Sequence, residues 1–486
     1  MSSSLRKSLA RLGFSARDNG PPLRDLFRDK ETESNFPVKG SYWTKNFIDN
    51  LIQEETVRQE LDRAKGKYTD ELVDFIVHPA KRVFCIAVLA PAPNIIQIMK
   101  FFRVFHIDDI LVGKDIRLDK NDFVRQMNSR IPRKTVTELD ESVWKPFLAK
   151  MTTNDAQWKI LVPVFSTERT NYTFPNRTIL PMNKINLPQR LRSGFSEVHK
   201  VKIESGHFVD PSCAESEWPE YFAVKEIIVP DYHQEEFDGS WTKDVGALKT
   251  ISSSHEKHIV RFMTAFTRGW TPTRSYYMIF EWADGGSLED LFIQWPNPEL
   301  NETLTKQTVT QLIGLFDALQ AIHDREIRHG DLKPKNGMYS ILRFGPTDDN
   351  IFGTLKIGDW GMSRVHDMNK VPRKPKAKYD ASLYEPSEVR IGVISYQDDV
   401  WSMGCIILEI VIWLLDGYDE VKKFRSDITG YSRSPSSYVV KWLDHMVNKE
   451  SRCPPGTALG DLLRLVRDKL LVVESSPETE QTTPET

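Results

Sequence analysis

The sequence predicts an α+β fold in which a small helical domain precedes two lobes, the first rich in β-strands and the second helical. Three changes of pattern predict it. Apolar residues recur at helical spacing from about residue 41 to residue 151, and short β-branched and aromatic runs replace them from about residue 159. Long amphipathic patterns return after Gly285. Ser287 with Asp290 forms a capping pattern for the helix that follows, and Trp241, Val245 and Leu248 give an earlier segment an amphipathic face. A strand-rich lobe followed by a helical lobe indicates an enzyme with a cleft between them.

The domain boundaries follow these changes. Both ends of the chain are polar and lack an apolar period, so we expect them to be disordered. His106, Asp108 and Asp109 are close in sequence, but their spacing favours an ordinary loop over a metal site. The predicted segments are a disordered tail at 1–40, a helical domain at 41–158, a catalytic domain at 159–473 with lobes at about 187–283 and 284–473, and a disordered acidic tail at 474–486.

Length and composition exclude several classes of protein. With 486 residues, the chain has room for about three domains of roughly 150 residues each. The 65 Lys and Arg nearly balance the 68 Asp and Glu, for a net charge of −3, so we expect no nucleic-acid partner. The four cysteines form no C-x-x-C pair, which argues against a disulfide scaffold or a zinc knuckle.

Two apolar runs, 83–102 and 400–415, are candidates for membrane spans. Prolines interrupt the first, and the second is too short and contains Glu409, so we expect no membrane partner. The second run instead predicts a helix buried on all sides. The basic stretch 1–17 fits either a solvated tail or a mitochondrial presequence. We expect a cytoplasmic or nuclear protein, with a mitochondrial location as the alternative.

The run 329–336 contains the residues most directly suited to catalysis. Asp331 is followed by Lys333 two residues later and by Asn336 five residues later. In phosphoryl transfer, an acid accepts the substrate hydroxyl's proton, a lysine steadies the γ-phosphate and an asparagine oxygen binds Mg²⁺. The eight-residue run supplies all three in one compact loop, and chance is a poor explanation for it.

Two weaker signals flank this run. Lys225 ends an Ala-Val-Lys run on a predicted strand, where a lysine can project into a cleft and hold phosphate oxygens. Asp359 lies between two glycines in the run 357–361, where a carboxylate can bind Mg²⁺ bridging the nucleotide phosphates. A solvent-facing lysine and a simple Asp/Gly turn are the alternatives. The order of Lys225 and Asp359 around the run 329–336 favours the catalytic interpretation.

Two more segments complete the series: a Tyr-Glu-Pro-Ser-Glu run at 384–388 and Asp399 at the start of the buried helix. From about residue 187 to residue 473, the sequence resembles the eukaryotic protein kinase family, and Lys333 resembles its Ser/Thr branch. The resemblance implies a two-lobed protein kinase fold, ATP and Mg²⁺ as cofactors, and a protein substrate with serine or threonine. By this resemblance Asp331 and Lys333 are catalytic, Lys225 binds ATP, and Asn336 and Asp359 are metal ligands.

The resemblance also implies roles for residues around the nucleotide. Phe280 falls at the gatekeeper position, and backbone groups of Glu281 and Ala283 would take the adenine edge. Asp399 resembles the family's buried aspartate that binds the catalytic-loop backbone. The remaining assignments are Gly194, Val198 and Ala223 beside the nucleotide, Leu248, Phe262, His329 and Trp360 as an apolar spine, and Glu388 at the end of the activation segment.

The sequence departs from the family pattern at several places. The phosphate-covering stretch 192–198 has one glycine, Gly194, so we expect weaker ATP binding. Asp244 occupies the place of the glutamate that pairs with the ATP lysine, and it is one methylene shorter. Gly330 replaces the arginine that normally reads a phosphate on the activation segment. The C-terminal part offers no clear arginine partner for Glu388.

Three functions are compatible with these features. The leading hypothesis is an active ATP-dependent protein serine/threonine kinase, because all four polar groups at 225, 331, 336 and 359 are retained. A pseudokinase that acts as a binding or scaffold module is the alternative, and a small-molecule kinase is a third. The helical extension most resembles that of kinase-like proteins common in filamentous fungi. Because Gly330 replaces an arginine, we expect this extension or a partner to regulate activity.

Overall fold

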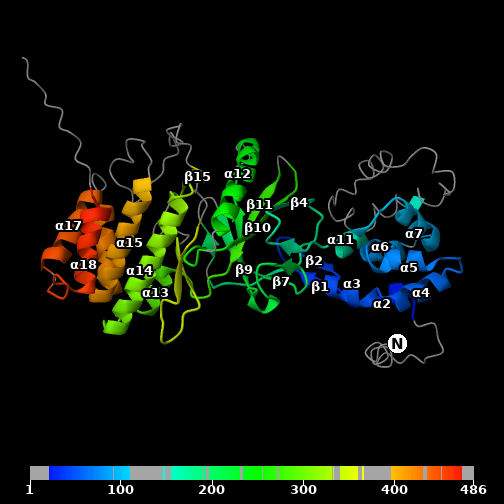
Figure 1. The fold of residues 1–486 in the computed structure, drawn as a ribbon, viewed down its shortest axis with the longest axis horizontal. Coiled ribbons are helices and arrows are strands. Elements are labelled where there is room, and N and C mark those ends of the chain that lie inside the picture. Colours follow the sequence, from blue (N-terminus) through cyan, green and yellow to red (C-terminus); the bar gives the residue numbers. More distant parts are fainter. Residues whose placement is uncertain are drawn as a thin grey trace, which may run out of the picture. The chain divides into compact units, whose positions relative to one another are not determined.

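Figure 1 shows the helices and strands of the computed structural model. The chain divides into two compact units. Unit 1 comprises Met1–Pro188, His199–Glu226 and Thr264–Met278, and unit 2 comprises Gln189–Val198, Ile227–Met263 and Ile279–Thr486. The structure describes residues 21–90, 92, 94–109, 146–147, 155–188, 190–192, 196–229, 234–253, 256–270, 273–330, 332, 340–359, 364–365, 396–430, 435–449 and 451–472.

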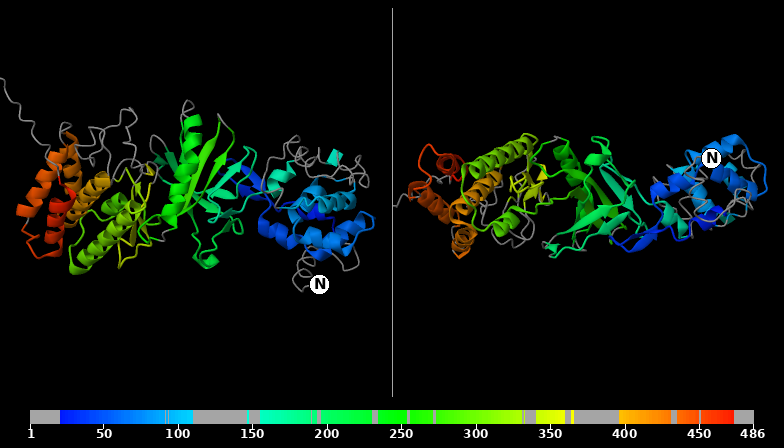
Figure 2. Two further views of the ribbon diagram at one scale, coloured as in Figure 1. Left: turned by 45° about the horizontal axis from the view of Figure 1, so that its top comes forward. Right: turned by 90° about the horizontal axis from the view of Figure 1, so that it is seen from below.

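Unit 1 begins with helices that share one apolar core (Figure 2). Side chains cap two of them: Thr44 accepts the N–H of Phe47, and Asn94 accepts the N–H of Gln97, each at 3.1 Å. Every residue of the stretch 83–88 is buried, so one of these helices is surrounded by the others. The helices expected in this part of the chain are therefore present. They are α3 (Lys45–Leu51), α4 (Glu54–Arg63), α5 (Asp70–Val77), α6 (Lys81–Leu89), α7 (Ile95–Val104) and α11 (Ala156–Ile160).

The predicted disordered tail at 1–40 is wrong for residues 21–40. This stretch forms α2 (Leu23–Leu26) and the strand β1 (Thr32–Ser34), which pairs with β2 (Gly40–Tyr42). Leu23 and Phe27 lie in the same core as the helices, and the Trp43 indole N–H donates to the Phe27 carbonyl at 3.0 Å. The few apolar residues here form no periodic pattern, so only the core that they join shows their role.

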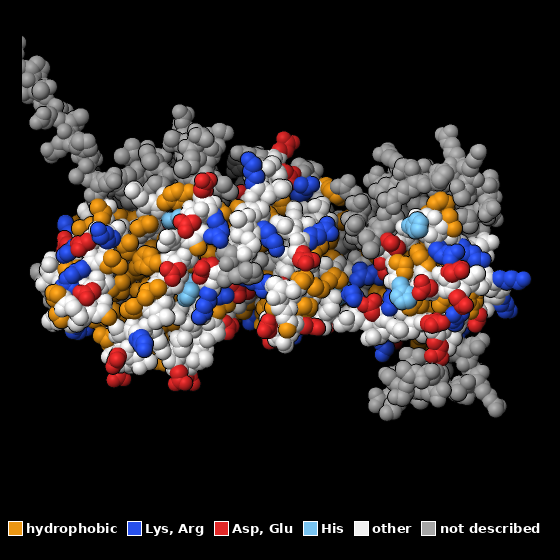
Figure 3. All heavy atoms as spheres, viewed as in Figure 1, with side chains coloured by type: hydrophobic (Ala, Val, Ile, Leu, Met, Phe, Trp, Pro, Cys, Tyr) orange, Lys and Arg blue, Asp and Glu red, His pale blue; other side chains and the backbone are white. Residues whose placement is uncertain are grey.

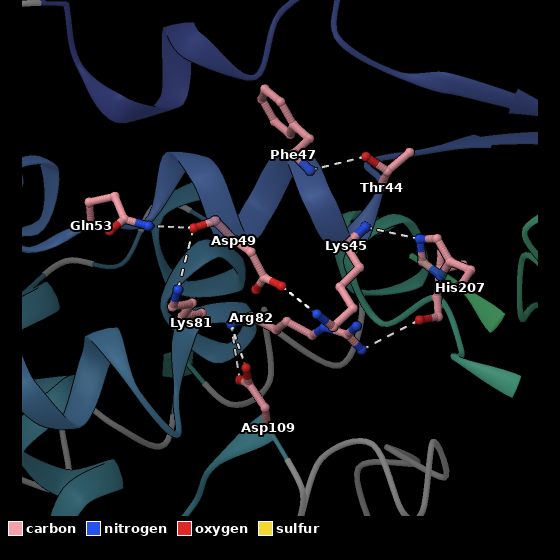
Figure 4. Close-up of polar contacts among 10 residues, drawn as sticks. Thr44, Lys45, Phe47, Asp49, Gln53, Lys81, Arg82, Asp109 and His207 are labelled. Carbon is pink, nitrogen blue, oxygen red and sulfur yellow. Dashed lines mark hydrogen bonds and ion pairs between the residues drawn. The ribbon is translucent and has the colours of Figure 1, made fainter. Parts of the chain in front are cut away.

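A buried histidine joins the helices to the rest of unit 1 (Figure 4). His207 Nε2 accepts the N–H of Lys45 at 2.9 Å, and its Nδ1 lies 2.9 Å from the Pro163 carbonyl. A ring that donates from one nitrogen and accepts at the other is neutral. Burial is the main reason that the pKa of His207 falls to about 4, which keeps it neutral at physiological pH.

The central feature of the strand-rich part is a seven-stranded sheet in the order β4-β10-β11-β9-β7-β5, with β6 paired to β7. Its two outer strands come from residues 171–184. The predicted start of the strand lobe at about 187 is therefore too late. The strands are β4 (Asn171–Phe174), β5 (Met182–Lys184), β6 (Leu191–Arg192), β7 (Ser196–Ile203), β9 (Phe222–Ile227), β10 (Phe262–Arg268) and β11 (Ser275–Glu281).

The helical part of unit 2 is built around α15 (Tyr396–Asp416). All residues of 401–414 are buried, which confirms the prediction of a helix surrounded by protein. Ser287 and Asp290 form the predicted capping box at the start of another helix, with the Asp290 N–H donating to Ser287 Oγ at 3.1 Å. The other helices are α12 (Gln234–Ser252), α13 (Leu288–Gln294), α14 (Glu302–His323), α16 (Tyr418–Gly430), α17 (Pro435–Lys449), α18 (Ala458–Leu465) and a π-helical turn at Val466–Leu470.

A buried ion-pair network lies within this helical part. The Arg425 guanidinium binds both carboxylate oxygens of Glu409, at 2.9 and 2.7 Å, and lies 2.7 Å from the carboxylate of Glu289. Removing one partner from such a network is costly because the other charges stay buried. The α+β fold class, with strand-rich and helical parts after N-terminal helices, is thus confirmed.

The surface of the described residues is mixed in character. Lysine and arginine are interspersed with aspartate and glutamate on the face shown in Figure 3, and hydrophobic side chains gather over α14 and α15. Among the described residues, no helix is both long enough and apolar enough to cross a bilayer.

Candidate functional site

The backbone immediately before the predicted catalytic base is held by one buried carboxylate. Asp399, on the first turn of α15, accepts the N–H of His329 and the N–H of Gly330, each at 2.8 Å. His323 Nε2, at the end of α14, lies 3.0 Å from the same carboxylate. The role that the resemblance implied for Asp399, binding the backbone of this loop, matches this geometry.

The pKa of Asp399 lies below its ordinary value. Burial opposes ionisation, but the hydrogen bond from His323, the charge of His329 and the two backbone N–H groups outweigh it. The carboxylate is therefore charged at physiological pH. A charged acceptor makes stronger hydrogen bonds than a neutral one, so the loop backbone is firmly held.

Gly330 has a backbone reason to be glycine. Its φ is +76°, in the left-handed region that residues with a Cβ rarely adopt. An arginine at this position would have to adopt a strained backbone, at about 1–2 kcal/mol. The left-handed backbone thus gives a physical reason for glycine at this position, which the sequence showed only as a substitution.

His329 connects this loop to the predicted metal ligand. Its side chain is fully buried, and Nε2 lies 2.7 Å from the carbonyl of Gly358, directly before Asp359. Asp359 follows β14 (Thr354–Ile357), is half-buried and has φ +60°. Non-glycine residues in this region are uncommon and concentrate at functional sites. The loop before residue 331 and the predicted metal-binding aspartate are therefore directly linked.

Lys225 lies on β9 in unit 1, and its side chain is only 4% exposed. A lysine ammonium is almost never buried unless it is paired, so its burial favours a specific role over a solvent-facing strand lysine. Ala223, two residues earlier, is half-buried. Because strand residues two apart point to the same face, Ala223 and Lys225 share one face of the sheet.

The helix that carries Asp244 has the predicted apolar face. Trp241, Val245 and Leu248 of α12 are buried, and Asp244 itself is half-buried. Phe262, another predicted member of the apolar spine, is also buried. Leu248, Phe262 and His329 are thus all buried, and the apolar spine itself stays a prediction.

The segment predicted to meet the adenine edge ends β11. Phe280 is buried, with its ring centroid 5.6 Å from that of Phe262. The N–H of Glu281 donates to the Arg261 carbonyl at 3.1 Å. Because that N–H is used, a purine at this position would contact the carbonyl of Glu281. The Ala283 carbonyl accepts the Gly286 N–H at 3.3 Å. The predicted contact between Ala283 and a purine would therefore use the Ala283 N–H.

The Glu281 side chain has a role that the sequence did not reveal. Its carboxylate binds Lys356 Nζ at 2.7 and 2.9 Å and accepts the Arg261 N–H at 2.7 Å. Lys356 belongs to β14, three residues before Asp359. This ion pair links the end of β11 to the strand that leads to the predicted metal ligand. Nothing in the local sequence pattern signalled it, because the two partners lie 75 residues apart.

Several predicted site residues lie outside the described residues, and their assignments stay predictions. The strands β6 and β7 pair Leu191 with Val198, on either side of the stretch that contains Gly194. The positions of Val198 and Ala223 are described, but their roles beside a nucleotide remain predictions as well. Those outside the described residues are Gly194, Asp331, Lys333, Asn336, Trp360 and Glu388.

The chain is similar to protein kinases over about half of its length. Residues 203–442 match the family described as protein kinase domain. The mitosis inhibitor protein kinase SWE1 of Candida albicans is 26% identical over 224 residues, which cover 43% of this chain and 18% of that protein. CTD kinase subunit alpha of Schizosaccharomyces pombe is 28% identical over 204 residues, covering 39% of this chain and 29% of that protein.

A plant protein shows a comparable similarity. Cyclin-dependent kinase E-1 of Arabidopsis thaliana is 29% identical over 172 residues, covering 35% of this chain and 34% of that protein. The chain thus spans about a third or less of the length of these curated relatives.

Proposed function

We propose that this chain transfers the γ-phosphoryl group of MgATP to a serine or threonine hydroxyl of a protein. The premise is that residues 203–442 place the chain in the eukaryotic protein kinase family. One observation carries the proposal. Asp399 and His329 link the loop before residue 331 to the strand end before Asp359. The backbone segments that lead to these two predicted groups are therefore linked through one buried framework.

Each side chain has a defined part in the proposed reaction. Asp331 accepts the proton of the substrate hydroxyl, and Lys333 steadies the γ-phosphate. Lys225 holds the α- and β-phosphate oxygens. Asn336 and Asp359 hold Mg²⁺, which supplies positive charge that neutralises the phosphate oxygens. The half-buried Asp359 at the end of β14 and the buried Lys225 are of the types that this ligand requires.

A second candidate function is a pseudokinase that binds partners without phosphoryl transfer. Two features favour it. The stretch 192–198 has one glycine where phosphates need close approach of backbone N–H groups, and Asp244 replaces the longer glutamate. Both weaken nucleotide binding and neither removes a group that reacts. We therefore rank an active kinase above a scaffold.

The proposed partners are ATP and a protein with an acceptable serine or threonine. The names of two relatives, a cyclin-dependent kinase and a kinase subunit, describe proteins that work with other chains. We propose that this chain is also regulated by protein contacts, through its N-terminal helices or a partner, because Gly330 leaves no arginine beside the predicted base.

The test measures nucleotide binding and transfer separately on the full chain. MgATP at 100 times its Kd should stabilise the fold by about 2.7 kcal/mol. Asp359→Asn should lose the Mg²⁺-dependent part of this stabilisation, and Asp331→Asn should keep it but lose transfer to a generic protein substrate. Asp348→Asn, at an exposed position between β13 (Ile341–Phe344) and β14, is the matched control.

The outcomes separate the two functions. Stabilisation by MgATP together with transfer that Asp331→Asn abolishes supports the kinase. Stabilisation without any transfer supports the pseudokinase. If millimolar MgATP leaves the unfolding temperature unchanged, the nucleotide site itself is refuted.

A further inference from the structure

Glu226, the neighbour of Lys225, is bound by two side chains of the sheet. His199 Nε2 on β7 lies 3.0 Å from one carboxylate oxygen of Glu226, and the Tyr277 hydroxyl on β11 donates to the other at 3.1 Å. β9 lies between β11 and β7 in the sheet. The side chain of Glu226 therefore fastens β9 to both of its neighbouring strands, next to the lysine.

Phe36, from the segment that the sequence predicted to be disordered, covers this contact. Its ring centroid lies 4.8 Å from that of His199 and 6.1 Å from that of Tyr277. Phe36 is 5% exposed. On the other side, Tyr277 stacks on Phe266 with centroids 4.6 Å apart. We call Phe36, His199, Glu226 and Tyr277 the Glu226 cluster.

The segment 33–36 is itself held on an edge of the sheet. The Asn35 N–H donates to the Met182 carbonyl at 3.4 Å, and the Lys184 N–H donates to Asn35 Oδ1 at 2.6 Å. Ser34 Oγ also donates to the Met182 carbonyl at 3.0 Å. Met182 and Lys184 belong to β5, the last strand of the sheet. The chain here pairs with an otherwise open edge and carries Phe36 to the cluster.

The cluster joins a charged group, Glu226, whose side chain is 34% exposed, to His199 and Tyr277, which are buried. Its hydrogen bond with His199 is the main reason that the pKa of Glu226 lies below the ordinary value, so the side chain is a carboxylate. Burial, and then the charge of Glu226, raise the pKa of Tyr277, so its hydroxyl keeps the proton that it donates. Phe36 covers His199 and Tyr277, and a hydrogen bond to a charged acceptor is stronger than one between neutral groups.

Successive side chains of a strand point to opposite faces, so a strand fastened through Glu226 presents Lys225 to the other face in one fixed orientation. We propose that the segment 33–36 is a positioning element for Lys225, acting through the Glu226 cluster. The inference rests on the proposed function for the role of Lys225 in ATP binding. It identifies how the N-terminal part of the chain controls that site: undocking of Phe36 loosens β9 and misplaces the lysine.

The experiment compares Phe36→Ala with Val38→Ala in the full chain. Val38 lies two residues later in the same segment and is 55% exposed, so it is the matched control. Phe36→Ala should raise amide hydrogen exchange across 222–227 by tenfold or more, with no change in α15. The Kd and KM for MgATP should rise about fivefold or more, with a smaller change in kcat. Val38→Ala should leave all of these at the wild-type values.

A second variant tests the proposal in case Phe36→Ala does not fold. Glu226→Gln keeps the size of the side chain and an acceptor for Tyr277 but removes the charge that faces His199. We expect it to weaken MgATP binding about threefold, without changing exchange in α15. Phe36→Leu, which keeps an apolar side chain, should restore most of what Phe36→Ala loses.

One further readout needs no nucleotide. Acylation of Lys225 by a small amine-reactive reagent, followed by mass spectrometry of the apo chain, should be at least threefold faster in Phe36→Ala than in wild type. If wild type binds no MgATP, the proposed function fails, and this rate still decides whether the cluster positions the lysine. Unchanged acylation and exchange, or faster exchange with unchanged MgATP affinity and acylation, would overturn the inference.

Discussion

Asp109, after α7 in unit 1, and Asp399, in the helical part of unit 2, perform the same structural task. Asp109 accepts the N–H groups of Arg82 and Val83 at the start of α6, at 2.9 to 3.0 Å (Figure 4). Asp399 accepts two N–H groups of the loop before residue 331 at 2.8 Å. Each carboxylate satisfies backbone donors that have no partner within their own segment.

Their pKa values nevertheless move in opposite directions. Burial is the main reason that the pKa of Asp109 rises from 3.8 to about 6, although its backbone hydrogen bonds and the charge of Arg82 oppose the shift. The pKa of Asp399 falls despite burial, because His323 and His329 add to the backbone hydrogen bonds. Two backbone donors and the charge of Arg82 are thus insufficient to offset burial at Asp109. The side-chain hydrogen bond from His323 is the largest of the contributions that lower the pKa of Asp399.

Replacement of each aspartate by alanine tests this comparison most strongly. Asp399→Ala should cost about 3–5 kcal/mol, because it leaves His323 and two buried N–H groups without their shared acceptor. Asp109→Ala should cost about 1 kcal/mol, as for a helix cap, because the loss is offset by removing a poorly solvated charge. Hydrogen exchange in urea, read separately on α15 and α6, gives both free energies. Equal losses would contradict the distinction.

The two carboxylates should also respond oppositely to pH. Asp109 binds its proton more tightly in the folded state, so its contribution to stability is greatest below pH 3.8 and falls as the pH rises to about 6. The loss is at most about 3 kcal/mol, at about 1.4 kcal/mol per pKa unit. Asp399, with its lowered pKa, contributes stability above its unfolded pKa and loses it as the pH falls through the folded one.

Asp109→Asn should remove the decline in stability of α6 between pH 4 and pH 6, measured by urea unfolding across that range. Asp108→Asn, at the adjacent half-buried position, is the control and should keep the wild-type profile. If Asp109→Asn also shows the wild-type decline, another group is responsible for it.

The smallest expected effect comes from making Asp399 resemble Asp109. His323→Gln keeps a donor of similar reach but removes the imidazole that supports the charge of Asp399. We expect a loss of about 1 kcal/mol at pH 7 and an upward shift of the acid-unfolding midpoint of α15 by about one pH unit. Unchanged acid unfolding would mean that the backbone donors alone determine the ionisation of Asp399.

Sequence reasoning found the features that depend on neighbouring residues. The apolar run 400–415, the Ser287 cap and the buried face of α12 are all confirmed, because periodicity and capping require only residues within a few turns. The predicted site residues were found through the order of short motifs. The structure shows that Asp399 and His329 lie where that order implies, and Asp331 and Asn336 fall outside the described residues.

Tertiary contacts determined the rest. Phe36 and Phe27 are isolated aromatics in a polar stretch, and their burial depends on a sheet face and a helical core formed by distant residues. The Glu281–Lys356 ion pair, the left-handed backbone of Gly330 and the opposite pKa shifts of Asp109 and Asp399 likewise depend on partners from other elements. A sequence encodes local periodicity directly, whereas burial and charge environment arise only when segments far apart in the chain are brought together.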